Sequence, residues 1–185
     1  DLGARGDLVQ LRALCDAADI DAFVPVCTEE LSDQRTPAFI LHLGSIVREV
    51  VDLAVAENVL DTTRLMPQAS WERIGRYAKL SVEKGAGGWF GIHFGLWKLH
   101  GETPLWLLFS EGEFGQAEHV RRSIESWVAR NGILTTTYNG DFAIALDIPV
   151  GEEKDAVVRS LVDELSTIAS LLGSVSDDTA SFPSR

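Results

Sequence analysis

Residues 71–110 constrain the fold more than any other stretch of this chain, because they concentrate its aromatic residues. Four of the five tryptophans and one of the two tyrosines lie there, in the sequence WERIGRYAKLSVEKGAGGWFGIHFGLWKLHGETPLWLLFS. Aromatic and β-branched residues favour strands, and glycines permit the turns between strands. This stretch is therefore predicted to form the core of a β-sheet.

Three strands are predicted within this stretch. The first strand is predicted over residues 72–82, where successive side chains would point to opposite faces. One face would carry Ile74, Arg76, Ala78 and Leu80, and the other would carry Arg73, Gly75, Tyr77 and Lys79. Gly85–Gly88 is predicted to be a hairpin turn that leads into a strand over residues 89–94. Residues 95–101 form either a helical turn closed by Gly101 or a continuation of that strand, and residues 105–109 form a short buried strand.

Apolar residues recur with helical spacing on both sides of this stretch. Thr36-Pro37 is a helix start signal, and the apolar stripe that follows predicts a helix to about residue 58. Further helices are predicted over residues 7–18, 114–131 and 152–172, a loop over 61–70, and two strands over 133–138 and 141–148 joined by Asn139-Gly140. The predicted class is α+β, with N-terminal helices followed by an antiparallel sheet of about five strands that has helices on one face.

The domain prediction is a helical part over residues 1–70, a sheet domain over 71–173 and a flexible tail over 174–185, packed as one compact unit. A hydrophobic content of 45% and a charged content of 24% are typical of soluble globular proteins. We expect no membrane span and no export signal, because no long apolar run is present. Cys15 and Cys27 are the only cysteines, so we expect both to be reduced and the protein to be cytoplasmic.

Charge is distributed unevenly along the chain. The net charge is −12, and residues 1–70 carry twelve acidic and five basic side chains, whereas residues 71–100 carry two acidic and five basic ones. The positive segment is thus also the aromatic one, an arrangement by which proteins hold single-stranded nucleic acid, with bases on rings and phosphates on cations. The candidate nucleic-acid-binding residues are Arg73, Arg76, Tyr77, Lys79, Lys84 and Lys98, joined by Arg121 and Arg122 from a helix. The alternative is that the aromatic residues form the core and the cations are ordinary surface residues.

No catalytic signature stands out. The four histidines are not spaced as converging metal ligands, and Gly85–Gly88 lacks the ending of a phosphate-binding loop. Asp147, Glu152 and Lys154 resemble the acids and lysine of a metal-dependent nuclease, but the two acids are too close together, and Glu152 is better explained as complementing a helix dipole. We therefore assign no catalytic residue, metal or cofactor, which favours a non-catalytic role and leaves the question of enzymatic activity open.

The run WFGIHFGLWKLHGETPLWLLF, together with DLVQLRALCDAADIDAFVPV and IGRYAKL, resembles the C-terminal portion of bacterial proteins of the PD-(D/E)XK nuclease superfamily. In those proteins an aromatic-glycine strand, a Gly-x-Thr-Pro-Leu-Trp-Leu run and two strand–helix units follow the nuclease core. Such nucleases place one acid on a strand and an acid-x-Lys motif on the next, and this chain has no such pair. The resemblance therefore implies a companion region without the active site, which places substrate, senses a partner or controls the nuclease in defence against foreign DNA.

Three hypotheses follow from the sequence. The first is a non-catalytic accessory module of a nuclease-like protein that binds DNA or RNA or senses a protein partner. The second is a protein-interaction or homo-oligomerisation domain with no nucleic-acid role. The third is a divergent metal-dependent nuclease whose acids come from distant segments.

Overall fold

The computed structural model describes residues 10, 32–80, 86–112 and 115–174. Apart from Gln10, the helix predicted over residues 7–18 lies outside the described residues, as do both cysteines, Lys84 and the predicted tail beyond residue 174. The chain divides into two compact units, Asp1–Phe39 and Ile40–Arg185. The second unit contains the whole sheet.

Within the described ranges, four helices and seven strands form an α+β fold, which confirms the predicted class. In chain order the elements are α3 (Arg35–Ala56), β1 (Leu60–Asp61), β2 (Pro67–Ala69), β3 (Arg73–Leu80), β4 (Gly87–His93), α4 (Phe94–His100), β5 (Leu105–Phe109), α5 (Ala117–Asn131), β6 (Thr135–Tyr138), β7 (Asp141–Ala145) and α6 (Lys154–Ser174). All strand pairs are antiparallel, in the order β1-β3-β4-β5-β7-β6, and β2 also pairs with β3.

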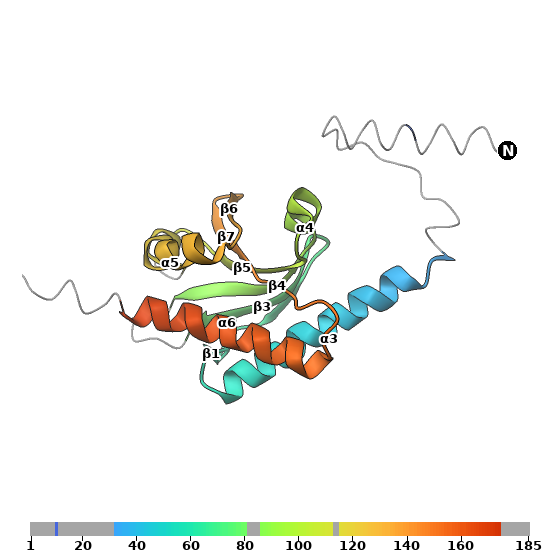
Figure 1. Ribbon diagram of the computed structural model, residues 1–185, viewed down its shortest axis with the longest axis horizontal. Helices are drawn as coiled ribbons and strands as arrows, with labels where there is room; N and C mark the ends of the chain where they lie inside the picture. Colours follow the sequence, from blue (N-terminus) through green and yellow to red (C-terminus); the bar gives the residue numbers. More distant parts are fainter. Residues whose placement is uncertain (1–9, 11–31, 81–85, 113–114, 175–185) are drawn as a thin grey trace, which may run out of the picture. The chain divides into compact units, whose positions relative to one another are not determined.

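The two faces of the sheet are covered by different helices. Figure 1 shows α3 and α6 on one side of the sheet and α4 on the other. We call the side that packs against α3, α5 and α6 the covered face, and the opposite side the α4 face. Neighbouring residues of the central strands divide between them: Phe90 and Leu107 belong to the large cluster on the covered face, and Trp89 and Leu108 to a separate cluster on the α4 face. Because side chains pack on both faces, every residue of β4 and β5 is buried.

The alternation predicted for β3 is confirmed. Ala78 and Leu80 pack in the cluster of the covered face, and Tyr77 packs against the cluster of the α4 face. Gly75 leaves room between Arg73 and Tyr77 on the α4 face, where a Cβ would lie 2.6 Å from Cζ2 of Trp89. The missing side chain thus lets the Trp89 ring lie across β3.

Two local predictions are corrected by the structure. The loop predicted over residues 61–70 contains the short strand β2, and Asp61 belongs to β1, because extended segments of this region pair with β3. Pro67 is tolerated there since short edge strands accept proline. Gly87 and Gly88, predicted as turn residues, instead begin β4. A Cβ at Gly88 would lie 2.9 Å from the carbonyl oxygen of Leu108, so this glycine permits the close approach of β5.

The β6–β7 hairpin turns as its sequence predicts. Asn139 and Gly140 adopt positive φ angles of 50° and 89°, which a tight two-residue hairpin requires. The turn sets Tyr138 directly opposite Asp141 in the strand register. A residue of β6 and a residue of β7 are thereby brought together at one end of the sheet.

The segment after β4 is a helical turn, the first of the two alternatives open from the sequence. The ring Nδ1 of His93 accepts the backbone N–H of Leu96 at 3.2 Å and so caps the start of α4. Gly101 ends the helix with a φ of 73°. No described helix has the length and apolar character needed to span a membrane.

Candidate functional site

The sequence-predicted binding residues are divided by the structure among separate places. Arg73, Tyr77 and Lys79 lie on the α4 face of β3, and Lys98 is exposed on α4 itself. Arg76 lies on the covered face, where its Nη2 donates to the carbonyl oxygen of Leu65 at 3.0 Å. Arg121 and Arg122 lie on α5, and Lys84 lies outside the described residues. The structure therefore brings four of the eight residues to one side of the sheet, and their role in binding stays a prediction.

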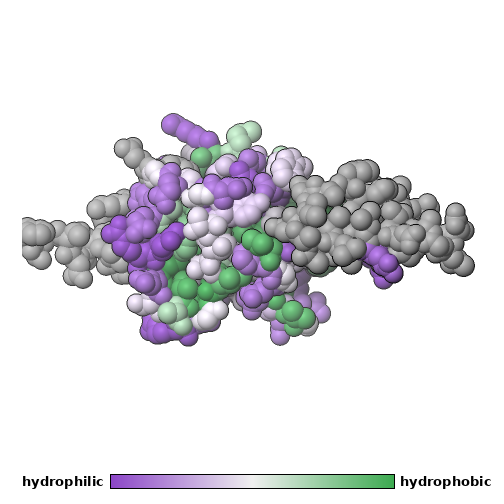
Figure 2. Space-filling model, turned by 90° about the horizontal axis from the view of Figure 1, so that it is seen from above, coloured by the Kyte–Doolittle hydropathy of each residue, from purple (hydrophilic) through white to green (hydrophobic). Residues whose placement is uncertain are grey.

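Tryptophan rings are not exposed where the sequence suggested base stacking. Trp89 and Trp106 are 1% and 0% exposed, so both belong to the core of the α4 face. Tyr77 is the half-buried aromatic residue between Arg73 and Lys79. Figure 2 shows the surface seen from above, with a green strip of hydrophobic residues in the lower middle of the view and purple hydrophilic residues to its left and above it. The aromatic residues of the central strands are thus chiefly core residues.

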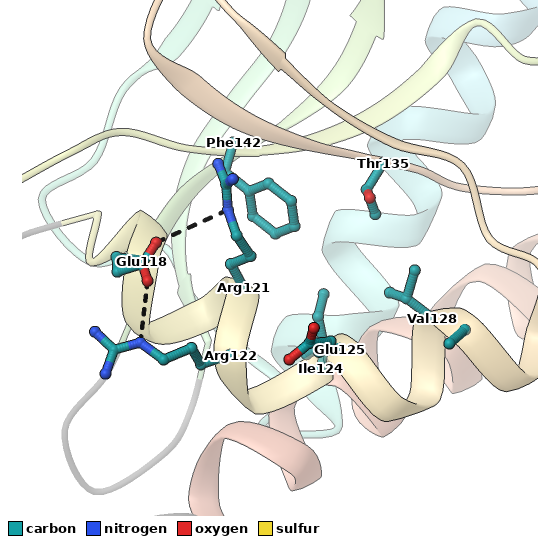
Figure 3. A pocket seen from close by; sticks show the side chains of 9 residues that line it. Glu118, Arg121, Arg122, Ile124, Glu125, Val128, Thr135 and Phe142 are labelled. Atoms are coloured by element: carbon teal, nitrogen blue, oxygen red, sulfur yellow. Dashed lines mark hydrogen bonds and ion pairs between the residues drawn. The ribbon is translucent and has the colours of Figure 1, made fainter.

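A concave region with a volume of about 500 Å³ lies between α5 and the β6–β7 hairpin (Figure 3). Arg121 projects toward the hairpin, with its guanidinium carbon 4.9 Å from the centre of the Phe142 ring and its Nη2 donating to Oγ1 of Thr137 at 3.1 Å. Ile124 and Val128 form the apolar floor. The volume of this concave region, which we call the α5 pocket, is within the range of ligand pockets.

The charges of this α5 pocket are largely balanced. Glu118 bridges both arginines, at 3.1 Å from Nε of Arg122 and 4.0 Å from Nε of Arg121, as Figure 3 shows. Glu125 lines the pocket as well. All three members of the bridge are exposed, and such surface pairs contribute little to stability. The pocket therefore does not present a concentrated positive field.

A polar cluster on the α4 face assembles residues from β3, β4, β6 and β7. The hydroxyl of Tyr138 donates to Oε1 of Glu72 at 2.6 Å. The ring of His93 meets the rings of Trp89 and Tyr138 edge-on, with centroids 6.0 Å and 5.0 Å apart. The guanidinium of Arg73 lies 5.4 Å from the Trp89 ring centre and donates to the Tyr77 hydroxyl at 3.4 Å. Acid, base and aromatic groups are therefore in contact on this face.

Burial shifts the pKa values of several residues in this polar cluster. Burial lowers the pKa of His93, and the charge of Arg73 lowers it further, against the opposing effect of Glu72. Burial also raises the pKa of Asp141, although the charges of Arg73 and His93 oppose the rise. The hydrogen bond to Glu72 raises the pKa of Tyr138, with burial as the second cause. His93 is therefore a neutral cap near neutral pH.

A small cavity of about 50 Å³ opens beside this cluster. Its lining includes Arg73, Tyr77, Trp89, Ser110 and Asp141. The sequence singled out the β3 residues but missed Asp141, Glu72 and Tyr138. Only the Asn139-Gly140 turn signalled that residues 138 and 141 meet, and nothing in the sequence signalled that they meet β3.

An acidic pocket of about 190 Å³ lies beside the loop that follows α5. Its lining includes Glu102, Asp147 and Glu164. Burial first, and then the negative charge of Asp147, raise the pKa of Glu164 to about 7.

Within the described ranges no group of three or more His, Cys, Asp or Glu side chains is arranged to hold a metal ion. Lys154, which the sequence analysis compared with the lysine of a metal-dependent nuclease, forms an ion pair with Glu49 at 2.8 Å.

Comparisons with protein-family models, curated proteins and solved structures give no match to this chain. The resemblance to the PD-(D/E)XK nuclease superfamily therefore stays a prediction.

Proposed function

We propose that the α4 face binds single-stranded nucleic acid and that the chain is a non-catalytic module that positions the strand. The observation that carries this proposal is the row of Arg73, Tyr77 and Lys79 on one face of β3, with Lys98 exposed on the same side. Cations spaced around an aromatic ring match the phosphates and bases of an extended strand. If the resemblance to nuclease-associated regions holds, the strand would be presented to a nuclease core.

Nucleic-acid binding by this acidic chain would depend strongly on the salt concentration. The net charge of −12 repels a polyanion, so attraction must come from the local cations and must weaken steeply as salt screens them. Lys79 is exposed and lies beside Asp61, whose pKa is lowered chiefly by hydrogen bonds from Thr63 and further by the charge of Lys79. Lys98 is exposed near the end of α4. These two lysines are the residues whose reversal tests the proposal with least disturbance of the fold.

The test is fluorescence anisotropy with labelled single-stranded and duplex DNA across a salt series, with magnesium present and cleavage followed on a gel. We expect salt-sensitive binding without cleavage. Lys79→Glu with Lys98→Glu should weaken binding by about tenfold or more at low salt, because two phosphate contacts become repulsive. Arg76 is left unchanged in this test because it holds the Leu65 carbonyl.

The matched control is Arg48→Glu with Arg159→Glu, which makes the same charge change on α3 and α6. This control should bind as the wild-type protein does apart from a small effect of net charge. Unchanged affinity in a folded Lys79/Lys98 double variant would remove the α4 face from consideration. Magnesium-dependent cleavage would instead support a divergent nuclease.

A protein-interaction function is the second candidate, and exposed apolar side chains favour it. Trp71 and Met66, on either side of β2, are 89% and 76% exposed, and Val150 is 97% exposed. Large apolar side chains at a surface mark interaction sites when they form a patch. Size measured by light scattering across a concentration series checks this candidate: a growing mass without DNA binding would replace the first proposal.

A further inference from the structure

The cavity beside β3 is lined by a residue with a buried, unsatisfied hydrogen-bond donor and by a half-buried carboxylate. Trp89 is 1% exposed, and its indole Nε1–H has no hydrogen-bond partner among the described residues. The half-buried carboxylate of Asp141 receives no hydrogen bond from the described part of the chain either. Both side chains line the same cavity. Leaving the buried indole N–H unpaired away from water is costly, which points to a ligand group that accepts it and that also meets the neighbouring carboxylate.

The charges and the size of the cavity restrict that group. Arg73 and Asp141 lie close enough for their charges to interact, and they offset each other, so an added phosphate or carboxylate would leave an uncompensated charge beside Asp141. A volume of about 50 Å³ admits the edge of a planar group and not a whole ring system. A neutral edge that has an acceptor next to an N–H donor satisfies both Trp89 and Asp141.

Nucleobases have edges of this kind. Each of the four bases presents an acceptor beside a donor on its Watson–Crick edge, and these edges are free in single strands but already paired in a duplex. Tyr77 and Arg73 also line the cavity, and both a tyrosine ring and a guanidinium plane can stack on a base that projects from it. Lys79, two residues along the same face of β3, is placed to meet a phosphate of the same strand.

We propose, building on the function proposed above, that this cavity receives the Watson–Crick edge of an unstacked nucleobase, which accepts the indole N–H of Trp89 and donates an N–H to Asp141. Such a site tolerates any base, because every base has the required pair. It also gives single strands an advantage over duplexes that does not depend on charge.

The proposal is tested with two oligonucleotides of equal length, oligo(dT) and the same strand made of N3-methylthymidine. The methyl group removes the ring N–H at the base edge and leaves the charge and the stacking ring in place. We expect the wild-type protein to bind oligo(dT) about tenfold more tightly than the methylated strand, the size of a lost base-edge contact. Anisotropy at one fixed low salt concentration measures this ratio.

Asp141→Ala should bring the ratio to about one, whatever it does to the overall affinity. Asp52→Ala, which removes an exposed acid from α3, makes the same charge change away from the cavity and should keep the wild-type ratio. Trp89→Phe removes the donor that pairs with the base oxygen, so it should weaken the binding of both strands, and Asp141→Ala alone decides the outcome of the ratio. An equal ratio in wild-type protein and in Asp141→Ala overturns the proposal.

A second measurement observes the indole group directly. The five tryptophans give separate indole N–H resonances in ¹⁵N-labelled protein, and Trp89→Phe assigns the one of interest. Addition of 1-methyluracil should shift the Trp89 resonance in wild-type protein and not in Asp141→Ala. A response to acetamide but not to 1-methyluracil would overturn the nucleobase assignment in favour of an Asn or Gln side chain of a partner protein.

The outcomes separate this inference from the function on which it rests. Salt-sensitive binding of both oligonucleotides with equal affinity leaves the proposed function standing and overturns the role of the cavity. No binding of either strand at low salt overturns both. A preference for oligo(dT) that disappears in Asp141→Ala supports both.

Discussion

The two faces of this sheet are built from neighbouring residues of the same strands but differ in chemistry. On the covered face, Val50, Phe90 and Leu107 belong to a continuous apolar cluster with α3, α5 and α6. On the α4 face a smaller cluster shares its space with His93, the Tyr138–Glu72 hydrogen bond and an unpaired indole N–H. The comparison indicates that stability is concentrated on the covered face, whereas the chemistry suited to recognition is on the α4 face.

The largest effect is expected from a charge placed in the covered face. Val50 is 0% exposed on α3, so Val50→Asp buries an unpaired carboxylate and should destabilise the protein by about 3–5 kcal/mol or unfold it. Urea denaturation followed by circular dichroism measures the change. Val55→Asp, at a 38% exposed position of the same helix, is the control and should cost far less. Near-wild-type stability of Val50→Asp would show that the covered face does not depend on α3.

Adjacent leucines of β5 compare the two faces directly. Leu107 and Leu108 are 2% and 3% exposed and lie in the covered-face and α4-face clusters respectively. We expect Leu107→Ala to cost about 3–4 kcal/mol and Leu108→Ala about 2 kcal/mol, because the smaller cluster loses fewer contacts. Both values come from chemical denaturation under the same conditions. Equal costs, or a larger cost at Leu108, would break the distinction between the faces.

The partly buried carboxyl group of Glu164 on α6 is expected to make the stability of the protein depend on pH. Its pKa rises from 4.5 to about 7 on folding, so between these pH values the folded state binds more protons than the unfolded state. Stability should therefore fall as the pH rises from about 4.5 to about 7 and stay lower above that range. Glu164→Gln removes this loss and should be more stable than wild type at about pH 8, by about 2 kcal/mol, with little difference at about pH 4.

Denaturation curves at these two pH values measure the effect, and Glu152→Gln, at an exposed position before α6, is the control. If wild type and Glu164→Gln show the same dependence on pH, the carboxylate of Glu164 is solvated in the folded protein.

The smallest effect is expected on the α4 face. Tyr138→Phe removes the hydroxyl that donates to Glu72 at 2.6 Å and should cost about 1 kcal/mol, because the pair is partly exposed to water. Tyr77→Phe removes a weaker contact, at 3.4 Å from Arg73, and should cost less. Thermal melts compare the two variants. A loss at Tyr138 as large as that at Leu107 would make the polar cluster a main source of stability and would contradict the comparison.

Much of the fold followed from local sequence patterns. The periodic stripes predicted α3, α5 and α6, and the alternation of Ile74–Leu80 with its neighbours predicted both faces of β3. The short strands β1 and β2 were missed because two or three residues have no period to detect. Gly88 was misread as a turn residue, since a glycine that permits close strand packing looks the same in sequence as one that permits a turn.

By itself, the sequence determined the α+β class and the positions of the main helices and strands, because spacing along the chain fixes which side chains share a face. Only the tertiary structure decided that Arg76, which the alternation places opposite Arg73 and Lys79, donates to the Leu65 carbonyl. It also decided that Asp141 lies in the same cavity as Trp89. The order of strands in the sheet sets such long-range contacts, and that order depends on how complete faces pack against each other, which no local pattern encodes.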